Sequence, residues 1–317
     1  MRTVLLDSAT LGPKDLDFSD IKAAVKSLVC YQYTHPDEVL MRLARAEIAL
    51  VNKVVLDAKH LSQLPHLKHI IVLATGVNNI DLEMAKKLGI SVQNCQAYGV
   101  SAVAQHCLML MLSLSTKMLS YRRAINNGEW STSKQFCMLD YPIESLEGKT
   151  LGIVGHGDLG KGVADLARAF GMTVVIAARQ GCKPIHGRIP LAKMLPQVDI
   201  LSLHCPLTPE TTNLIDWPQL RALPNHALLI NCARGGIVNE AALIRALDEG
   251  QISGAGVDVL TQEPPPKDHP LLAVQRDNLI ITPHTAWASR QARQTILNQT
   301  AENIKSVILG QPFIRQL

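Results

Sequence analysis

Three ionisable side chains are of the types that a proton transfer to a small acid requires. His284 can exchange a proton near neutral pH, because imidazole titrates there. A carboxylate such as Glu263 beside an imidazole fixes its orientation and favours its protonated form. Arg234 offers a planar guanidinium that matches a carboxylate or a 2-oxo acid. The three residues form a candidate catalytic group, provided that the fold brings them together.

Each of these side chains stands at or just beyond the end of a short apolar run, and the runs cover residues 227–233, 254–260 and 278–283. The carboxyl ends of parallel strands lie along one edge of a sheet, where distant residues converge on one bound molecule. Any one of the three is more often structural: a histidine satisfied in a core, a surface glutamate or an arginine in a salt bridge. Their shared position after strands favours a common site.

A further apolar run leads into the turn Gly-His-Gly-Asp-Leu-Gly at 155–160, and a helical pattern over 159–170 follows. Strand, turn and helix form the context in which this motif binds a dinucleotide. Gly155 makes the tight turn, Gly157 lets a pyrophosphate approach the backbone, and Gly160 lets helix and strand pack closely. A plain glycine-rich turn is the alternative. The expected cofactor contacts here are Gly155, Gly157, Asp158, Leu159 and Gly160.

The end of the second strand in this series indicates which dinucleotide is bound. An NAD-binding site places an acid there for the ribose hydroxyls. This chain has Ala178 followed by Arg179 instead. An arginine can pair with the 2′-phosphate of NADP, and no acid stands next to it in the sequence to repel that phosphate. We expect NADP(H) to be preferred, with NAD(H) as a possible second cofactor. An exposed arginine without a ligand is the alternative.

Short β-rich runs alternate with amphipathic stretches along both parts of the chain. The strands expected before residue 100 cover 3–6, 28–33, 48–51, 70–73 and 91–93, with helices at 37–46 and 82–88. Those expected later cover 151–154, 173–177, 199–204, 227–233, 254–260 and 279–282, with helices at 159–170 and 240–249. Strands that alternate with helices predict right-handed crossovers and parallel sheets. The expected fold class is α/β, with two doubly wound parallel-sheet domains.

We place a smaller substrate-binding domain at residues 1–99 and a dinucleotide-binding domain at residues 100–286. A helical pattern over 289–309 follows the sixth strand and can return to the first domain, so residues 287–317 are expected to complete that domain. An apolar stretch covers residues 101–118. Because a membrane span needs about 20 predominantly apolar residues, we interpret this shorter, polar-punctuated stretch as a buried helix between domains or subunits.

A substrate also needs contacts on its other side, and residues 74–79 of the first domain follow a predicted strand. The glycine in this segment would let backbone N–H groups reach a small carboxylate. The candidate substrate-binding residues are Thr75, Gly76 and Val77. An ordinary turn explains the segment equally well.

Composition limits the classes of partner. The chain has 317 residues, 47% of them hydrophobic, and 31 basic against 27 acidic residues without a basic block, which argues against nucleic acid as the main partner. The cysteines are scattered singly, at Cys30, Cys95, Cys107, Cys137, Cys182, Cys205 and Cys232. This pattern favours a reducing cytosol over disulfides or a metal site. The N-terminus lacks the apolar stretch of a signal peptide. We expect a cytoplasmic protein with no membrane partner.

Taken together, these residues resemble those of the D-isomer-specific 2-hydroxyacid dehydrogenases. The motifs occur in order over nearly the whole chain: Gly-Val-Asn-Asn-Ile-Asp-Leu at 76–82, the glycine turn, Leu-His-Cys-Pro-Leu-Thr at 203–208, Asn-Cys-Ala-Arg-Gly-Gly at 231–236, Gly-Ala-Gly-Val-Asp-Val at 254–259, Glu-Pro at 263–264 and Thr-Pro-His at 282–284. The resemblance implies hydride transfer between a nicotinamide cofactor and a 2-oxo or 2-hydroxy acid. It also implies a Rossmann dinucleotide-binding domain with a smaller, flavodoxin-like substrate domain.

By this resemblance His284 is the acid/base, Glu263 orients it, and Arg234 binds the carboxylate and carbonyl of the substrate. The backbone N–H groups of residues 76–77 would bind the substrate carboxylate. Asp258 would hold the nicotinamide carboxamide. The remaining implied cofactor contacts are Arg179, His204, Cys205, Pro206, Cys232 and Ala233.

Within the family, residues 136–142 are similar to the hydroxypyruvate reductases, also called glycerate dehydrogenases, which also reduce glyoxylate. The family implies a homodimer joined through the cofactor domains and a cleft that hinges near residues 99–101 and 285–289. Three residues depart from the family pattern: Ala178 in place of an acid, Gln105 in place of glutamate and Cys107 in place of threonine.

Two other functional classes fit parts of the sequence. Some members of this family act as transcriptional co-repressors that respond to the dinucleotide, so a dinucleotide-sensing scaffold without significant turnover is the main alternative. Such relatives generally carry disordered extensions, and this chain has almost none. A glycine-turn methyltransferase is a weaker third candidate, because Arg234, Glu263 and His284 have no role in it.

Overall fold

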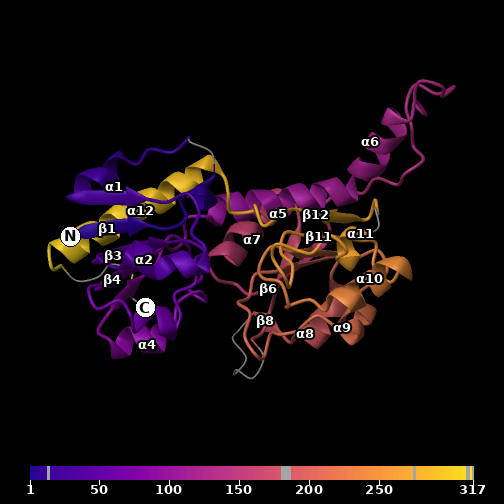
Figure 1. Cartoon of the computed structure of the whole chain (residues 1–317). Helices are drawn as coiled ribbons and strands as arrows, with labels where there is room; N and C mark the ends of the chain where they lie inside the picture. Colours follow the sequence, from indigo (N-terminus) through magenta and orange to yellow (C-terminus); the bar gives the residue numbers. More distant parts are fainter. Residues whose placement is uncertain (13–14, 180–186, 274–275, 312–314, 316–317) are drawn as a thin grey trace. The chain divides into compact units, whose positions relative to one another are not determined.

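The computed structural model describes residues 1–12, 15–179, 187–273, 276–311 and 315. Cys182 lies outside the described residues. The chain divides into two compact units (Figure 1). The first consists of Met1–Gly99 with Ala288–Leu317, and the second of Val100–Trp287.

The first unit is built on a five-stranded parallel sheet of order β2-β1-β3-β4-β5. Its strands are β1 (Arg2–Leu5), β2 (Ser27–Cys30), β3 (Ile48–Val51), β4 (His69–Val72) and β5 (Ser91–Gln93). Its helices are η1 (Ser8–Leu11), α1 (Ser19–Ala24), η2 (Pro36–Glu38), α2 (Val39–Leu43), α3 (Ala58–Leu61), α4 (Leu82–Lys87) and α12 (Arg290–Ile308). This strand order is the flavodoxin-like one.

The last helix, α12, packs in the first unit although it follows the second unit in sequence. Arg293, only 7% exposed, holds it there. Its guanidinium donates to both carboxylate oxygens of Asp15 and to the carbonyl of Leu11, each at 2.8 Å. A buried arginine needs such partners, because an unpaired buried charge is costly. The chain therefore completes its first unit with its last helix.

The second unit is built on a seven-stranded parallel sheet of order β12-β11-β10-β9-β6-β7-β8. Its strands are β6 (Thr150–Val154), β7 (Thr173–Ala177), β8 (Arg188–Ile189), β9 (Ile200–Leu203), β10 (Leu228–Asn231), β11 (Gly254–Val257) and β12 (Leu279–Ile281). Its helices are α5 (Val100–Ser115), α6 (Met118–Asn126), α7 (Asp158–Ala169), α8 (Leu191–Met194), η3 (Leu195–Gln197), α9 (Trp217–Ala222), α10 (Glu240–Asp248) and α11 (Pro270–Ala273).

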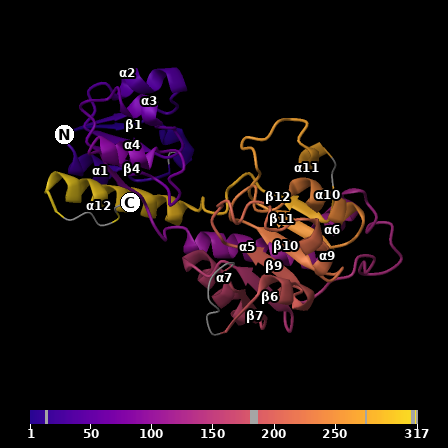
Figure 2. The same ribbon diagram turned by 90° about the horizontal axis from the view of Figure 1, so that it is seen from below.

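Helices cover both faces of this sheet (Figure 2). Side chains of α5 and α7 pack on one face, and those of α8, α9 and α10 pack on the other. Both faces are thus buried, as parallel sheets require. The two sheets with their helices confirm the predicted α/β class with a Rossmann and a flavodoxin-like part. The two-residue strand β8 is an addition to the six strands predicted from the sequence.

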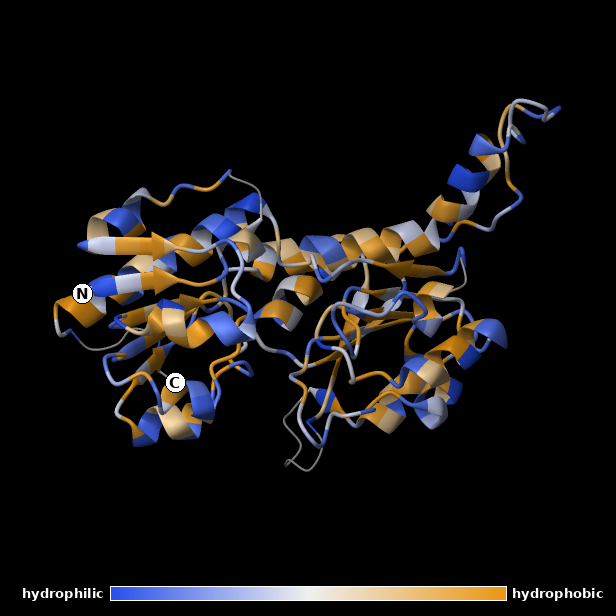
Figure 3. Cartoon of the chain, viewed as in Figure 1, coloured by the Kyte–Doolittle hydropathy of each residue, from blue (hydrophilic) through white to orange (hydrophobic). Residues whose placement is uncertain are grey.

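The apolar stretch 101–118 forms helix α5 and the start of α6 (Figure 3). Leu110 and Met111 are fully buried against the sheet of the second unit. The helix ends at Ser115, and Lys117 adopts a left-handed conformation with φ of 54° before α6 begins. In the described part of the chain no single helix is long and apolar enough to cross a membrane. Helices α5 and α6 reach that length and composition only as a pair bent by 60°.

Candidate active site

His284 lies in the loop that follows β12, in a backbone conformation that is unusual for a residue with a side chain. Its φ is 54°, in the left-handed region, which costs free energy outside glycine. Its amide donates to the carbonyl of Asp258 at 2.8 Å, and its carbonyl accepts from the indole of Trp287 at 2.9 Å. The surrounding bonds therefore hold the imidazole in one fixed position.

Glu263 is in direct contact with this imidazole. Its Oε2 lies 2.6 Å from Nδ1 of His284, and its Oε1 accepts the amide of Leu260 at 2.8 Å. A carboxylate only accepts hydrogen bonds, so the pair places the Nδ1 proton between them. That tautomer leaves Nε2 as the nitrogen that exchanges a proton with a ligand. The side chains of His284 and Glu263 are 30% and 34% exposed, which leaves the pair accessible.

Arg234 follows β10 in a loop shaped by Asn231. The Asn231 side chain, 2% exposed, donates to the carbonyl of Arg234 and accepts the amide of Ala233, both at 3.1 Å. A Cβ on Gly235 would lie 2.0 Å from the carbonyl oxygen of Leu260, so only glycine fits there. The Arg234 loop thus touches the loop that leads to Glu263. The guanidinium is exposed and forms no ion pair with any described residue.

Asp258 contacts the loop that carries His284 and is 1% exposed. Its carboxylate accepts the amides of Thr285 and Ala286 at 2.9 Å and the hydroxyl of Thr282 at 2.5 Å. The Thr282 hydroxyl also lies 2.9 Å from Nε2 of His106 on α5. Asp258 therefore anchors the segment that carries His284. Its predicted contact with a nicotinamide carboxamide stays a prediction.

The glycine turn joins β6 to α7 in the predicted way. Gly155 has φ of 94°, and a Cβ there would lie 2.5 Å from the carbonyl carbon of His204. A Cβ on Gly160 would lie 2.1 Å from the carbonyl oxygen of Gly155. Gly157, by contrast, has open space at its Cβ position and is the N-cap of α7, whose first residues are Asp158 and Leu159. The turn thus presents bare backbone at a helix N-terminus, which suits a pyrophosphate.

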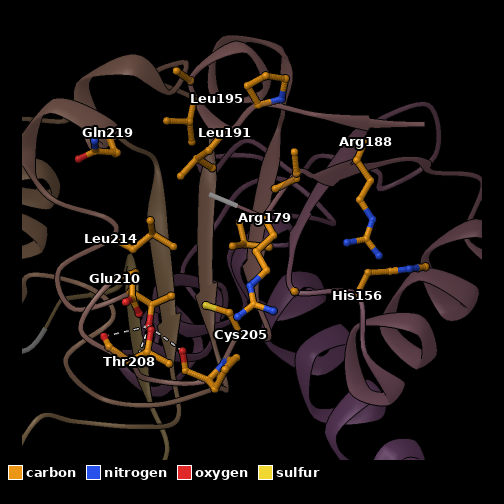
Figure 4. A pocket seen from close by; sticks show the side chains of 18 of the residues that line it. His156, Arg179, Arg188, Leu191, Leu195, Cys205, Thr208, Glu210, Leu214 and Gln219 are labelled. Carbon is orange, nitrogen blue, oxygen red and sulfur yellow. Dashed lines mark hydrogen bonds between the residues drawn. The ribbon is translucent and has the colours of Figure 1, made fainter. Parts of the chain in front are cut away.

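A cavity of about 1190 Å³ opens beside this turn (Figure 4). It lies at the carboxyl ends of β6, β7 and β9, where the strand order reverses and dinucleotides bind in such sheets. Leu191, Leu195 and Leu214 form an apolar wall of this cavity, and Arg179 contributes a positive charge to its lining. An apolar slot with cations at its edge fits a flat base and phosphates. Cys205 and Pro206, two of the predicted cofactor residues, also line it.

His204 follows β9 and is the electrostatically most perturbed histidine among the described residues. Burial lowers its pKa to about 4, so the imidazole is neutral at pH 7. Its Nε2 lies 2.8 Å from the hydroxyl of Ser202, while its buried Nδ1 has no hydrogen-bond partner in the described part of the chain. An unpaired buried nitrogen next to the glycine turn is the sort of atom that a bound cofactor would satisfy.

Cys232 and Ala233 are both buried, between β10 and Arg234. A hydrogen bond with Cys107 and burial raise the pKa of the Cys232 thiol, so this thiol stays neutral. Cys107, which departs from the family pattern, is thus a packing partner of Cys232. Whether Cys232 and Ala233 contact the cofactor stays a prediction.

The first unit contains the three predicted substrate-binding residues. Thr75, Gly76 and Val77 follow β4, and their turn is stabilised by the Asn94 side chain, which donates to the carbonyl of Thr75 at 2.8 Å. Thr75 is exposed. Their approach to the residues of the second unit stays a prediction.

Among the cavity residues that sequence reasoning missed are His156 and Arg188. His156 lies within the glycine motif, but its position is one that the motif leaves free. Arg188 belongs to β8, which is too short to leave a pattern in the sequence. Among the described residues no cluster of three or more His, Cys, Asp or Glu side chains is arranged to hold a metal ion.

The Rossmann sheet, the glycine turn with its cavity, and a histidine paired with a carboxylate at the same edge define a nicotinamide-dinucleotide-dependent oxidoreductase. Residues 108–286 match the family model of the D-isomer specific 2-hydroxyacid dehydrogenase NAD binding domain. The chain belongs to the D-isomer-specific 2-hydroxyacid dehydrogenase family, and it is an enzyme that interconverts 2-oxo and 2-hydroxy acids with a nicotinamide dinucleotide.

Three similar proteins illustrate this membership. A glycerate dehydrogenase of Methylorubrum extorquens is 45% identical over 277 residues, which are 87% of each chain. A hydroxypyruvate reductase of Blautia hydrogenotrophica is 31% identical over 98% of each chain. The structure of an acyclic imino acid reductase in complex with NADPH and D-Arg superposes with a TM-score of 0.87 at 26% identity, covering 100% of both chains.

Proposed function

We propose that this enzyme reduces hydroxypyruvate and glyoxylate to the D-2-hydroxy acids with NADPH. The observation that carries the proposal is the 2.6 Å contact between Glu263 and Nδ1 of His284. The similarity to a glycerate dehydrogenase and a hydroxypyruvate reductase supports this substrate class. The same relatives favour an enzyme over the dinucleotide-sensing scaffold.

Each residue of the catalytic group has a separate task in the proposed mechanism. Arg234 binds the carboxylate of the substrate and, through the same planar guanidinium, polarises its carbonyl oxygen. The reduced nicotinamide supplies a hydride to C2 when the cofactor is bound. His284 gives the proton on Nε2 to the carbonyl oxygen, and Glu263 stabilises the imidazolium before that transfer. In the reverse direction His284 takes the proton back.

The cofactor assignment depends on the two residues that follow the carboxyl end of β7. Ala178 is too short to bind ribose hydroxyls, and the Arg179 side chain lines the cavity (Figure 4). An arginine there supports NADPH over NADH. The structure adds one acid that the sequence did not indicate: Glu210 lines the same cavity. A hydrogen bond from Thr208 and, more weakly, the charge of Arg179 lower the pKa of Glu210.

The first unit is proposed to supply the other side of the substrate site. We assign residues 1–99, completed by 287–317, to substrate binding and residues 100–286 to cofactor binding. Backbone N–H groups of Thr75, Gly76 and Val77 are the proposed partners of the substrate carboxylate.

We propose a homodimer joined through the cofactor domains. Helix α6 and the segment after it project from the second unit (Figure 1). Large apolar side chains on this projection are exposed, namely Met118, Ile125, Trp130, Phe136, Leu139 and Ile143. Such a patch marks an interaction surface in a globular protein. The six cysteines among the described residues are free, which supports a reducing, cytoplasmic location.

A steady-state panel tests the proposed reaction. Glyoxylate, hydroxypyruvate, pyruvate and longer 2-oxo acids are each offered with NADPH and with NADH. We expect the highest kcat/KM for hydroxypyruvate or glyoxylate with NADPH. No oxidation of either cofactor by any of these acids would overturn the proposal, whereas a preference for NADH would overturn only the cofactor assignment.

A further inference from the structure

Three cationic or protonatable side chains from three different elements line the cavity beside the glycine turn (Figure 4). His156 belongs to the glycine turn, Arg179 follows β7, and Arg188 belongs to β8. The register of the two strands explains why the arginines share the cavity. Arg188 pairs with Ile176 and Ile189 pairs with Ala177, so Arg188 lies beside the end of the strand that leads to Arg179.

The two arginines point to different partners. In Figure 4 the guanidinium of Arg179 is directed toward Cys205 and Thr208, on the side of Glu210, whereas that of Arg188 is directed toward His156. Neither arginine forms an ion pair with a described residue. The negative charge of Glu210 offsets part of the charge of Arg179. The Arg188 end of the cavity therefore retains positive charge that a ligand can use.

The charges that surround His156 are predominantly positive. Burial comes first among the causes that lower its pKa, followed by Arg188, Lys161 and Arg168, while Asp165 acts in the opposite direction. His156 is therefore largely neutral without a ligand at pH 7. A phosphate dianion at this point would reverse the balance, because a negative charge close to an imidazole favours its protonated form.

We propose that His156 and Arg188, together with Arg179, recognise the 2′-phosphate of NADP(H), and that His156 takes up a proton as this phosphate binds. This inference rests on the proposed function, since it requires a dinucleotide in the cavity. Arg188 donates charge-assisted hydrogen bonds to the phosphate oxygens. His156 adds a bond whose strength depends on pH. The two residues thus set cofactor specificity from the end of the cavity opposite Glu210.

Calorimetric titration with 2′,5′-ADP and with 5′-ADP tests the inference without any turnover. The two probes differ only in the 2′-phosphate, so the ratio of their dissociation constants measures recognition of that group. We expect Arg188→Gln to weaken 2′,5′-ADP about tenfold, the loss of one charge-assisted hydrogen bond, and to leave 5′-ADP within about twofold. Arg45→Gln, which removes an exposed arginine from the first unit, is the matched control and should change neither constant.

The pH dependence separates His156 from a purely structural residue. The ratio of the two dissociation constants measures the preference for 2′,5′-ADP. From pH 6 to pH 8 this preference should fall more steeply in the wild type than in His156→Gln. The phosphate itself titrates near pH 6 in both proteins, so the difference between the two curves belongs to the histidine. At pH 6 we expect His156→Gln to weaken 2′,5′-ADP about tenfold, and at pH 8 by about twofold or less. Net proton uptake, read from buffers of different ionisation enthalpy, should disappear in His156→Gln.

The outcomes distinguish this inference from the proposed function. If both variants keep the wild-type ratio of the two dissociation constants at every pH, His156 and Arg188 do not read the 2′-phosphate, and the inference is wrong even though the enzyme still binds 5′-ADP and reduces 2-oxo acids. If the wild type binds neither probe, the cavity is not the cofactor site, and both proposals fail.

Discussion

At the scale of single residues, the site depends on a histidine that the fold fixes before any ligand binds. His284 adopts a left-handed backbone, and the Asp258 carboxylate holds the two amides that follow it. Strain of this kind persists only where surrounding bonds enforce it, and it is common at active sites. The sequence could predict the three residue types and their positions after strands. It could not predict the left-handed turn, because φ depends on the bonds from Asp258 and Trp287.

The contact between Glu263 and His284 predicts the behaviour of Glu263→Gln. The amide oxygen of glutamine can still accept a hydrogen bond from Nδ1 of His284, but a neutral amide cannot balance the charge of an imidazolium. We expect kcat to fall by about 10²-fold, at the low end of what general acid catalysis contributes, because His284 itself remains. KM for the 2-oxo acid and the dissociation constant of NADPH should change less than about threefold. Steady-state kinetics and a fluorescence titration of NADPH measure the three values; an unchanged kcat would contradict a role for this carboxylate.

His204 predicts a specific pH dependence of stability. Its pKa is lowered from 6.5 to about 4 in the folded state, so the unfolded chain binds more protons between these values. Stability should therefore fall as the pH drops from about 6.5 toward 4, by up to about 1.4 kcal/mol per pH unit from this group. The slope should be smaller in His204→Gln and unchanged in His66→Gln, an exposed control. Urea unfolding followed by tryptophan fluorescence reports on the second unit, which contains Trp130, Trp217 and Trp287; equal slopes in all three proteins would refute the assignment.

At the scale of the elements, loops after strand ends are positioned by close backbone contacts. Strand ends were predictable, because apolar runs of β-rich residues stop at Gly155, Arg234 and Thr282. The loop contacts were not, since the neighbour of Gly235 is Leu260, in another part of the sequence. The break at Lys117 between α5 and α6 was also missed, because nothing local in an apolar run requires a left-handed residue there.

Two glycine variants separate a structural contact from a binding surface. Gly235→Ala forces a Cβ to within 2.0 Å of a backbone oxygen, so the Arg234 loop must move. We expect a loss of about 1–3 kcal/mol in stability and a rise in KM for the 2-oxo acid. Gly157→Ala meets no heavy atom within 4 Å and should leave stability unchanged while weakening dinucleotide binding, because the methyl group occupies the place of the pyrophosphate. Thermal unfolding and NADPH titration check both; equal stability loss in the two variants would count against this division.

At the scale of the whole molecule, the order of motifs along the chain predicted two parallel-sheet parts, and the comparisons place both in one family. Repeated alternation of strands and helices is a strong signal, because each crossover needs one segment with the hydrophobic pattern of a strand and one with that of a helix. The sequence indicated that the last helix returns to the first unit. It did not indicate the contact that holds this helix there, because Arg293 and Asp15 lie far apart in the chain.

The exposed apolar projection predicts the oligomeric state. Phe136 and Leu139 are 92% and 75% exposed. We expect the wild type to be a dimer and the double variant Phe136→Asp, Leu139→Asp to dissociate, because burying two carboxylates at an interface is costly. Tyr33→Asp, at an exposed position of the first unit, is the control and should remain dimeric. Light scattering after gel filtration measures the masses; a dimeric double variant would place the interface elsewhere.

The most direct test of the whole account measures His284→Asn with NADPH and hydroxypyruvate. Asparagine keeps a polar group at this position but cannot give a proton to the carbonyl oxygen, so kcat should fall by about 10²–10⁴-fold. The dissociation constant of NADPH should stay within about twofold of the wild type, and His66→Asn should behave as the wild type in both measurements. Turnover by His284→Asn at near the wild-type rate, with NADPH bound normally, would contradict the assignment of this histidine as the acid/base.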